Sequence, residues 1–398
     1  MANHGKRLPI ARAKPLAARR KIKMARSLGT YIRGSTTRFY EWLARPAGPL
    51  PAGSPLWICG DCHVGNFGPI AGPEGDIEIH IRDFDQATVG NPAFDVIRLG
   101  LSLAADAATS DLSGVTTARM LEHLLKSYAA GLTRTTPKKG KKDDPKSLRK
   151  ILRVAENRSW QNLCTERLDG ARRAIPLGKR FWPISRQERD EIRRLVAGEE
   201  MISLVTCLRG RKTGARLHLL DAAFWVKGCS SLGRLRYAIL LGLKHKSGKP
   251  DHCLIDVKET TSSKAPASGR ARIPKNAAQR VVQGARRLTP AVGERMQPAR
   301  FLGRPVFIRE LRPQDLKPEI PRLSSDEVLQ LAGFLATVLA RAHADQMNVS
   351  ARRAWKRKVV RTGRNKAGPS SWLWTNVVEL MARHERAYLE HCAGIKFA

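Results

Sequence analysis

Residues 56–102 contain two short apolar runs, and each run is followed by a cluster of acidic and amide side chains. The runs at 56–59 and 77–81 are predicted strands, and the second alternates isoleucine with polar residues, as expected for a strand with one buried face. Asp61 and Asn66 follow the first run, and Asp83 and Asp85 follow the second. A carboxylate at the end of a buried strand needs a cation or hydrogen-bond donors to stay charged, so this stretch predicts a bound cation.

Oxygen ligands of this kind suit Mg²⁺, which binds one or two carboxylates together with substrate phosphates. An Asp followed five positions later by an Asn, and then an Asp-Phe-Asp after a strand, match the recurring parts of phosphoryl transfer. In that scheme Asp61 is the catalytic base or orients the acceptor, and Asn66 and Asp83 hold metal. Asp85 is a candidate second carboxylate ligand. The alternative is that each Asp caps a helix or closes a turn.

The same stretch resembles the bacterial domain-of-unknown-function family 2252. The resemblance rests on GDCHVGNFG at 60–68, IRDFDQ at 81–86 and NPAFDVIRLGLS at 91–102, and weaker blocks extend it over nearly the whole chain. Gln86 and Phe94 depart from the family, which usually has Glu and Trp at these positions. The resemblance implies no function by itself, so the functional prediction depends on the residues.

Two further sets of charged residues lie in segments that resemble the family. Arg33 falls on an Arg-Gly pair of the family and is a candidate phosphate contact, with a surface salt bridge as the alternative. A helix is predicted at 92–108, and it places Asp95 and Arg98 on adjacent turns. These two residues either brace the metal loop from behind or form an exposed ion pair.

The formal net charge is +37, from 72 Lys and Arg against 35 Asp and Glu in 398 residues. A field of this sign attracts nucleotides, nucleic acids and anionic membrane surfaces, although a bias toward arginine can also reflect genomic base composition. No stretch is apolar for long enough to span a bilayer, and the basic N-terminus lacks a following apolar segment. We therefore expect a cytoplasmic protein without a membrane span.

The seven cysteines are scattered, and their odd number without an export signal argues against a disulfide framework. Cys59 and Cys62 form a C-x-x-C beside His63, which would suit zinc or redox chemistry. No second pair of cysteines accompanies it, so a zinc site is the weaker interpretation.

A second set of candidate residues lies in 222–260, where two apolar runs flank a Gly/Ser turn. This pattern predicts a hairpin whose tip can lie over phosphates, although ordinary turns share the composition. The tip residues are Gly228, Ser230, Ser231 and Gly233. Lys258 ends the next predicted strand and a helix follows at 276–288, the order in which kinases place their nucleotide lysine. Kinases also place a Glu on that helix; none occurs here, so either Glu259 or Glu310 substitutes or the partner is absent.

The predicted elements follow the order of a permuted kinase. A kinase runs from phosphate hairpin, lysine strand and long helix to the catalytic and metal loops, whereas here the two loops come first and the long helix is at 325–345. Circular permutation is tolerated when the termini lie close together at the surface. We predict an α+β, two-lobed, circularly permuted protein-kinase-like fold. Its parts are a basic arm at 1–26, a helical lobe at 27–215, a small antiparallel β lobe at 216–320 and C-terminal helices at 321–398.

The leading hypothesis is an ATP- and Mg²⁺-dependent phosphotransferase that moves a phosphoryl or nucleotidyl group to an unknown acceptor. Lys258 and the hairpin tip would hold the phosphates of the nucleotide. One rival is a metal-dependent phosphoesterase, which would need His80 and His252 as further ligands. The other rival is a basic nucleic-acid-binding protein or a pseudokinase, although aromatic residues that could stack on bases make up only 6% of the chain.

Overall fold

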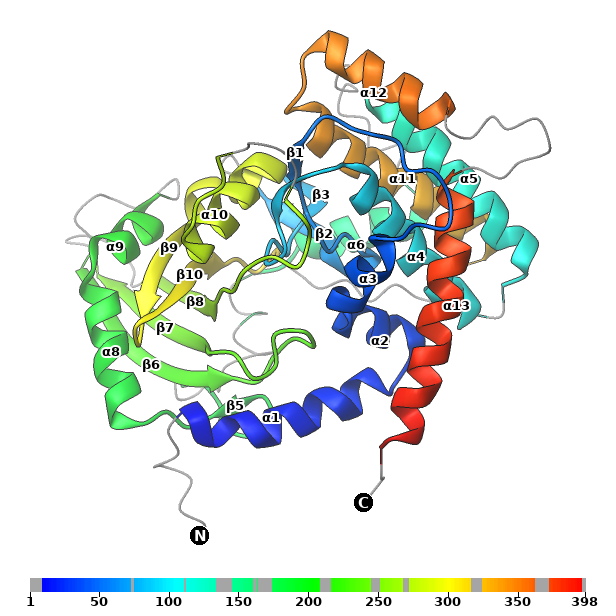
Figure 1. Ribbon diagram of the computed structural model, residues 1–398. Coiled ribbons are helices and arrows are strands. Elements are labelled where there is room, and N and C mark those ends of the chain that lie inside the picture. Colours follow the sequence, from blue (N-terminus) through cyan, green and yellow to red (C-terminus); the bar gives the residue numbers. More distant parts are fainter. Residues whose placement is uncertain are drawn as a thin grey trace.

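The computed structural model describes residues 9–72, 75–110, 112–133, 145–159, 163, 174–207, 216–244, 251–267, 272–315, 324–361 and 372–395. These residues form an α+β structure in which every paired strand is antiparallel, which confirms the α+β part of the predicted fold. A six-stranded sheet and a helix-rich part lie side by side (Figure 1). The first eight residues of the predicted arm and the charged segment 134–144 lie outside the described residues.

The six-stranded sheet has the order β5-β6-β7-β8-β10-β9. Its strands are β5 (Phe181–Trp182), β6 (Arg216–Trp225), β7 (Arg236–Lys244), β8 (Asp251–Glu259), β9 (Met296–Phe301) and β10 (Arg304–Leu311). Alternate residues of β7 face opposite sides, so Tyr237 and Ile239 join one apolar core and Ala238 and Leu240 join another. In the middle of the sheet Lys258 pairs with Arg236 on one side and with Phe307 on the other.

Helices α1 (Pro9–Met24), α8 (Arg186–Ala197) and α9 (Glu199–Thr206) cover one face of this sheet. Gly198 separates α8 from α9, and Ser185 and Glu188 form a capping box at the N-terminus of α8. Residues 9–24 of the predicted basic arm form a docked helix. The reason is that Leu16 is buried in the sheet core and the Arg12 guanidinium binds the Glu188 carboxylate at 2.6 Å.

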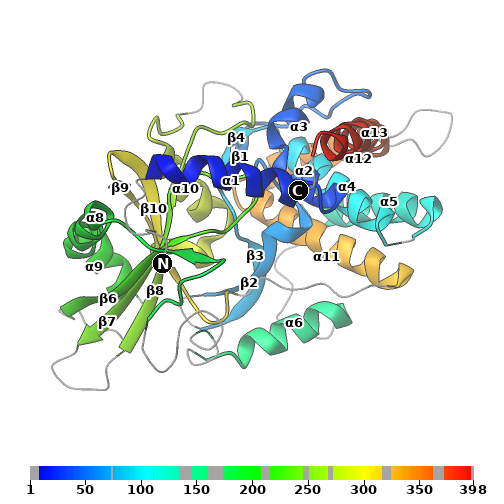
Figure 2. The ribbon, with the colours of Figure 1, turned by 90° about the horizontal axis from the view of Figure 1, so that it is seen from below.

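The helix-rich part contains α2 (Leu28–Gly34), α3 (Thr36–Leu43), α4 (Ala93–Ala108), α5 (Gly114–Gly131), α6 (Lys146–Glu156), α11 (Ser325–Ala344), α12 (Val349–Arg361) and α13 (Trp372–Ala393). Helices α5 and α11 pack closely because Gly131 has no side chain; a Cβ there would lie 2.8 Å from that of Ala340. Ser35 separates α2 from α3, and α12 was not predicted from the sequence. Figure 2 shows α1 extending from the six-stranded sheet to α2, so this helix joins the two parts.

The two strands predicted around the polar clusters lie in separate ribbons. Strand β1 (Leu56–Ile58) pairs with β4 (Thr88–Gly90), and β3 (Ile77–Ile81) pairs with β2 (Phe67–Ala71). Helix α10 (Ala277–Leu288) packs between these ribbons and the six-stranded sheet, with Gly284 against Ala87 and Trp57. Within the described residues, no helix combines the length and apolar character needed to traverse a lipid bilayer.

Candidate functional site

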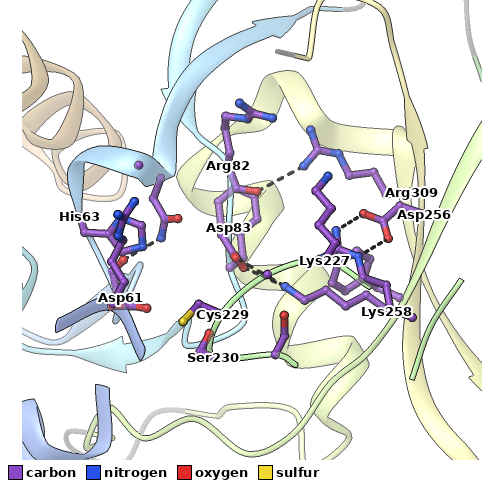
Figure 3. Close-up of a pocket in the computed structure, with 18 of the residues that line it drawn as sticks. Asp61, His63, Arg82, Asp83, Lys227, Cys229, Ser230, Asp256, Lys258 and Arg309 are labelled. Atoms are coloured by element: carbon purple, nitrogen blue, oxygen red, sulfur yellow. Dashed lines mark hydrogen bonds and ion pairs between the residues drawn. The ribbon is translucent and has the colours of Figure 1, made fainter. Parts of the chain in front are cut away.

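A cavity of about 430 Å³ lies between the six-stranded sheet and the helix-rich part (Figure 3). Its walls come from the end of α1 and from α2, the loop after β1, the loop after β3, the β6–β7 hairpin tip, and strands β8 and β10. The predicted residues that line it are Arg33, Asp61, Asn66, Asp83, Gly228, Ser230, Ser231 and Lys258. Of the other predicted residues, Asp85 lies directly behind Lys258, and Gly233 is part of the same hairpin tip without lining the cavity.

Asp61 is fixed by groups behind the loop that follows β1. Its Oδ1 accepts a hydrogen bond from Nε of Arg98 at 2.8 Å and lies 2.8 Å from Nη2 of the same guanidinium. Its Oδ2 accepts a hydrogen bond from the Thr36 hydroxyl at 3.2 Å. Arg98 is fully buried and also donates to the Ile32 carbonyl. The Asn66 amide donates to the backbone carbonyl of Asp61 at 2.7 Å, which sets the orientation of the Asn66 side chain.

Asp95 fixes the backbone of the same loop, which follows β1. Its carboxylate accepts hydrogen bonds from the backbone amides of Cys59 and Gly60 at 2.6 and 2.8 Å. Both Asp95 and Arg98 are completely buried, so they do not form the exposed ion pair that was the alternative, and each one instead binds the loop that carries Asp61. This geometry agrees with the predicted bracing of the loop from behind.

A buried chain of hydrogen bonds continues from Asp95 into the helices. The Trp355 indole N–H donates to the Tyr128 hydroxyl at 2.9 Å, and that hydroxyl lies 2.7 Å from Nδ1 of His343. Indole is only a donor, so the Tyr128 hydroxyl accepts from it. The other ring nitrogen of His343, Nε2, lies 3.3 Å from Oδ2 of Asp95. Four helices thus hold the Asp95 carboxylate in place.

Lys258 joins the sheet to the loop after β3. Its ammonium lies 2.8 Å from Oδ2 of Asp85 and 3.4 Å from Oδ1 of Asp83, although the lysine is only 4% exposed. Burial opposes the charge, but the two carboxylates raise the pKa of Lys258. Of the proposed substitutes, Glu259 binds Arg304 and the Leu235 amide instead. The acidic partners of Lys258 therefore come from the predicted metal loop.

The two carboxylates beside Lys258 differ in their surroundings. Asp83 is 47% exposed toward the cavity, whereas Asp85 is 10% exposed. Burial raises the pKa of Asp85 more than Lys258 lowers it, and Asp83 adds to the increase. Burial also raises the pKa of Asp83. The opposing effects, led by the Lys258 ammonium and the Asp85 backbone amide, are larger in sum, so the pKa of this carboxyl is lowered. Asp83 is therefore the member of the pair that stays ionised most readily.

The oxygen donors of this site fit Mg²⁺. Asp83 faces the cavity, Asn66 lines it, and Oδ1 of Asp85 is buried without a hydrogen-bond partner among the described residues. A buried carboxylate oxygen without a donor is costly, and a cation would relieve that cost. The described residues contain no cluster of three or more His, Cys, Asp or Glu side chains arranged to bind a metal. Mg²⁺ does not require one, because it takes one or two carboxylates and completes its shell with phosphates and water.

The hairpin tip closes one side of the cavity. Gly228 and Gly233 have φ values of 97° and 101°, which residues other than glycine rarely adopt, so the sharp turn depends on them. Lys23 of α1 donates to the Gly228 carbonyl at 2.8 Å. The docked α1 helix therefore fixes the position of the tip, an interaction that sequence analysis did not predict.

The cavity is strongly basic. Eight Lys and Arg residues line it, against three aspartates. The Arg236 guanidinium pairs with Asp256 in a two-pronged contact, and Arg309 binds both the Asp315 carboxylate and the Arg82 carbonyl. The excess of positive charge makes the cavity suited to a polyanion such as a triphosphate.

Several cavity residues were missed by sequence analysis. Asp256 could have been found, because it lies two positions before Lys258 on a strand and so shares its face. Arg82 precedes Asp83 directly, but nothing in the sequence indicated its contact with residue 315. Lys23 lay in a segment that was predicted to be an arm. These contacts join segments that are distant in the chain and have no local signature.

The two further histidines that a metal-dependent phosphoesterase would need lie outside the cavity. His80 and His252 do not line the cavity. Cys59 and Cys62 are both buried, and burial raises the pKa of the Cys62 thiol. His63 does line the cavity; burial lowers its pKa to about 4, so its imidazole is neutral at pH 7.

The fold and the cavity together define an α+β protein with a basic cavity between a sheet and a helix-rich part. The match to a family model covers residues 12–394, and the chain belongs to that family, DUF2252, described as an uncharacterized protein conserved in bacteria. No curated protein and no solved structure matches the chain. The family description assigns no activity, so functional inference depends on the cavity.

Proposed function

We propose that this protein is an ATP- and Mg²⁺-dependent phosphotransferase with a two-lobed, circularly permuted kinase-like fold. The observation that carries the proposal is the position of Lys258, 2.8 Å from Asp85 and 3.4 Å from Asp83, in the basic cavity that Asp61 and Asn66 also line. A lysine on a strand, carboxylates after a second strand, and an Asp with an Asn five positions later are the parts that phosphoryl transfer requires.

The permuted order is supported by the end of α11. The side-chain amide of Gln346, just after this helix, exchanges hydrogen bonds with the backbone N–H and carbonyl of Trp57 in β1, 289 positions away. The end of the long helix therefore lies beside the strand that leads to Asp61. A chain cut at this point, with its former ends joined elsewhere, gives the order found here.

In the proposed reaction the oxygen of an acceptor hydroxyl forms a bond to the γ-phosphorus of ATP. The bond from that phosphorus to the β,γ-bridging oxygen breaks, and its electron pair leaves with ADP. Asp61 accepts a hydrogen bond from the hydroxyl and receives its proton. Arg98 fixes Oδ1 of Asp61, so Oδ2, with Thr36 as its one donor, is the atom placed to accept it. Attack at the α-phosphorus with loss of pyrophosphate is the nucleotidyl variant.

Lys258 would bind the phosphates of the nucleotide, with the backbone around Gly228 and Ser230 above them. Asn66, Asp83 and Asp85 would hold Mg²⁺. When bound, this ion neutralises phosphate charge and orients the triphosphate. In the structure Lys258 pairs with the carboxylates of Asp83 and Asp85. Bound phosphate would contact Lys258, and bound Mg²⁺ would contact the two carboxylates, so the ligands would share the contacts that these three side chains now make with one another.

Calorimetric titration with ATP, with and without Mg²⁺, tests this proposal. We expect binding that strengthens at least about tenfold with Mg²⁺ and that loses this Mg²⁺ dependence in Asp83→Ala. Asp76→Ala, which removes an exposed carboxylate from the β2–β3 turn, is the matched control. Analysis of ADP against pyrophosphate after incubation separates phosphoryl from nucleotidyl transfer. If wild-type protein does not bind ATP, or if Asp83→Ala binds Mg²⁺-ATP as well as wild type does, the proposal is wrong.

A further inference from the structure

The cavity has a second basic group on the side of Asp61, formed by Lys23, Arg26 and Arg33. In the view of Figure 3, Asp61 and His63 lie on one side of Asp83, while Lys258 and Asp256 lie on the other. The second group belongs to the Asp61 side. A Cβ on Gly65 would lie 3.0 Å from Nη1 of Arg33 and 3.2 Å from the His63 ring, so Arg33 lies next to the Asn66 loop.

Among the described residues, no carboxylate forms an ion pair with Lys23, Arg26 or Arg33, whereas Lys258 and Arg236 on the other side are paired. Arg33 does act on the Asp106 carboxyl, because its charge opposes the increase that burial causes in the pKa of that group. Arg33 donates from Nε to the Gly29 carbonyl and from Nη2 to the Thr30 hydroxyl, and its Nη1 has no hydrogen-bond partner in the described part of the chain. The group therefore keeps donors for a ligand.

The like charges of this group oppose one another. Burial lowers the pKa of Lys23, and Arg26 and Arg33 lower it further against the effect of Cys229. Lys23 and Arg33 are half-buried, so water screens their repulsion only in part. Binding of an anion would remove this cost, and anions bind strongly where several unpaired cations converge.

We propose that Lys23, Arg26 and Arg33 bind an anionic group of the acceptor, so that the substrate is a small hydroxyl compound that carries a phosphate or a carboxylate. The identification of the ligand as the acceptor rests on the proposed function, but the anion site itself does not depend on it. The acceptor hydroxyl would point to Asp61 and the anionic group to Arg33. A neutral sugar or alcohol would leave these cations unpaired and would bind weakly.

Calorimetric titration of the full chain with glycerol 3-phosphate, glycerate and glycerol tests this proposal. Each is measured with and without Mg²⁺ and a non-hydrolysable ATP analogue. The test variant is Lys23→Gln with Arg33→Gln, which removes two charges and retains a donor to the Gly228 carbonyl. We expect the phosphate or the carboxylate compound to bind wild type at least about tenfold more tightly than glycerol, and this preference to be lost in the double variant.

Lys14→Gln is the control, because it removes a charge from an exposed position of the same helix. Urea denaturation of the double variant reports whether it is folded. The proposal is overturned if glycerol binds as well as the anions, if neither anion binds, or if Lys14→Gln has an equal effect. It is also overturned if the double variant loses the ATP analogue in parallel, because the group would then bind nucleotide. Absence of analogue binding by wild type contradicts the proposed function alone, and the titrations without nucleotide still decide the anion site.

Discussion

The ammonium of Lys258 lies 2.8 Å from the carboxylate of Asp85, across the boundary between the six-stranded sheet and the loop after β3. The lysine comes from the middle of the sheet, and the aspartate comes from a segment that packs on the helix-rich part. Arg280 of α10 fixes the backbone of this aspartate by donating to the Asp85 carbonyl at 2.8 Å. The two parts of the molecule therefore meet at the charges that are proposed to bind nucleotide.

Replacement of Lys258 by Met should weaken ATP binding at least about tenfold, because a charge-assisted contact to phosphate contributes roughly 1.5–3 kcal/mol. The same change removes the nearest cation of the buried Asp85, which keeps Arg234 at 3.7 Å, and should lower the free energy of unfolding by roughly 3 kcal/mol. Calorimetry and urea denaturation measure the two effects. Lys264→Met removes an exposed charge outside the cavity and should change neither. Equal ATP affinity in wild type and Lys258→Met would refute the assigned role of Lys258.

Replacement of Asp61 by Asn should lower ADP formation from ATP about 100-fold or more, since it removes the group that receives the acceptor proton. The amide oxygen can still accept from Arg98, and the amide NH₂ can donate to the Thr36 hydroxyl oxygen, so the affinity for ATP should change less than about twofold. Product analysis with water as the acceptor measures the rate. Glu41→Gln, an exposed position on α3, serves as the control. A variant that turns over ATP at the wild-type rate would show that Asp61 is structural.

Replacement of Asp95 by Asn should destabilise the protein by about 1–3 kcal/mol. The carboxylate accepts from the Cys59 and Gly60 amides, and an asparagine must turn its NH₂ toward one of these donors or toward His343. Urea denaturation gives the change in unfolding free energy. Tyr128→Phe, which removes the hydroxyl between Trp355 and His343, should cost a comparable amount. Wild-type stability in both variants would contradict the proposed bracing of the loop.

Asp315 should make stability depend on pH in a defined window. Burial opposes its charge, but Arg295 and Arg309 hold the pKa of this carboxyl below its ordinary value. A lowered pKa in the folded state contributes stability above the unfolded value of about 3.9 and loses it as the pH falls further. Asp315→Asn should therefore cost roughly 3–5 kcal/mol at pH 7, and the difference from wild type should shrink only below about pH 4.

Urea denaturation from pH 3 to pH 8 measures this dependence. The control is Asp190→Asn, because Asp190 forms a solvent-exposed pair with Arg193 and should contribute less than about 1 kcal/mol at any pH. A constant difference between wild type and Asp315→Asn down to pH 3 would show that the ion pairs of Asp315 do not carry the effect.

The local elements could be predicted because their signals are local. The strand before Asp83, the helix after Asn276 and the capping box of Ser185 and Glu188 all depend on residues within a few positions of one another. Lys258 was also placed correctly at the end of a strand. By contrast, β2 contains Gly68 and Pro69 and gives no strand signal, and it forms because β3 pairs with it.

The environment of the candidate site could be predicted only in part. The sequence pattern grouped Asp61, Asn66 and Asp83 in one predicted site. It did not identify the acidic partner of Lys258, because that contact spans 175 positions. The contacts of Phe94, where the family usually has Trp, could likewise not be predicted from the sequence. Its ring packs edge-on to Tyr40, whose hydroxyl donates to the Gly60 carbonyl at 2.6 Å, and neither contact has a local signature.

The central claim is that a divalent cation and a nucleotide bind together between Asp83 and Lys258. A crystal structure with Mn²⁺ in place of Mg²⁺ and a non-hydrolysable ATP analogue tests it most directly, because anomalous scattering locates the manganese. We predict one manganese peak within bonding distance of the Asp83 carboxylate, with the triphosphate against Lys258 and the acceptor side of the cavity open toward Asp61. A manganese or nucleotide bound on another surface, with Asp83 and Lys258 still paired as they are here, would contradict the claim.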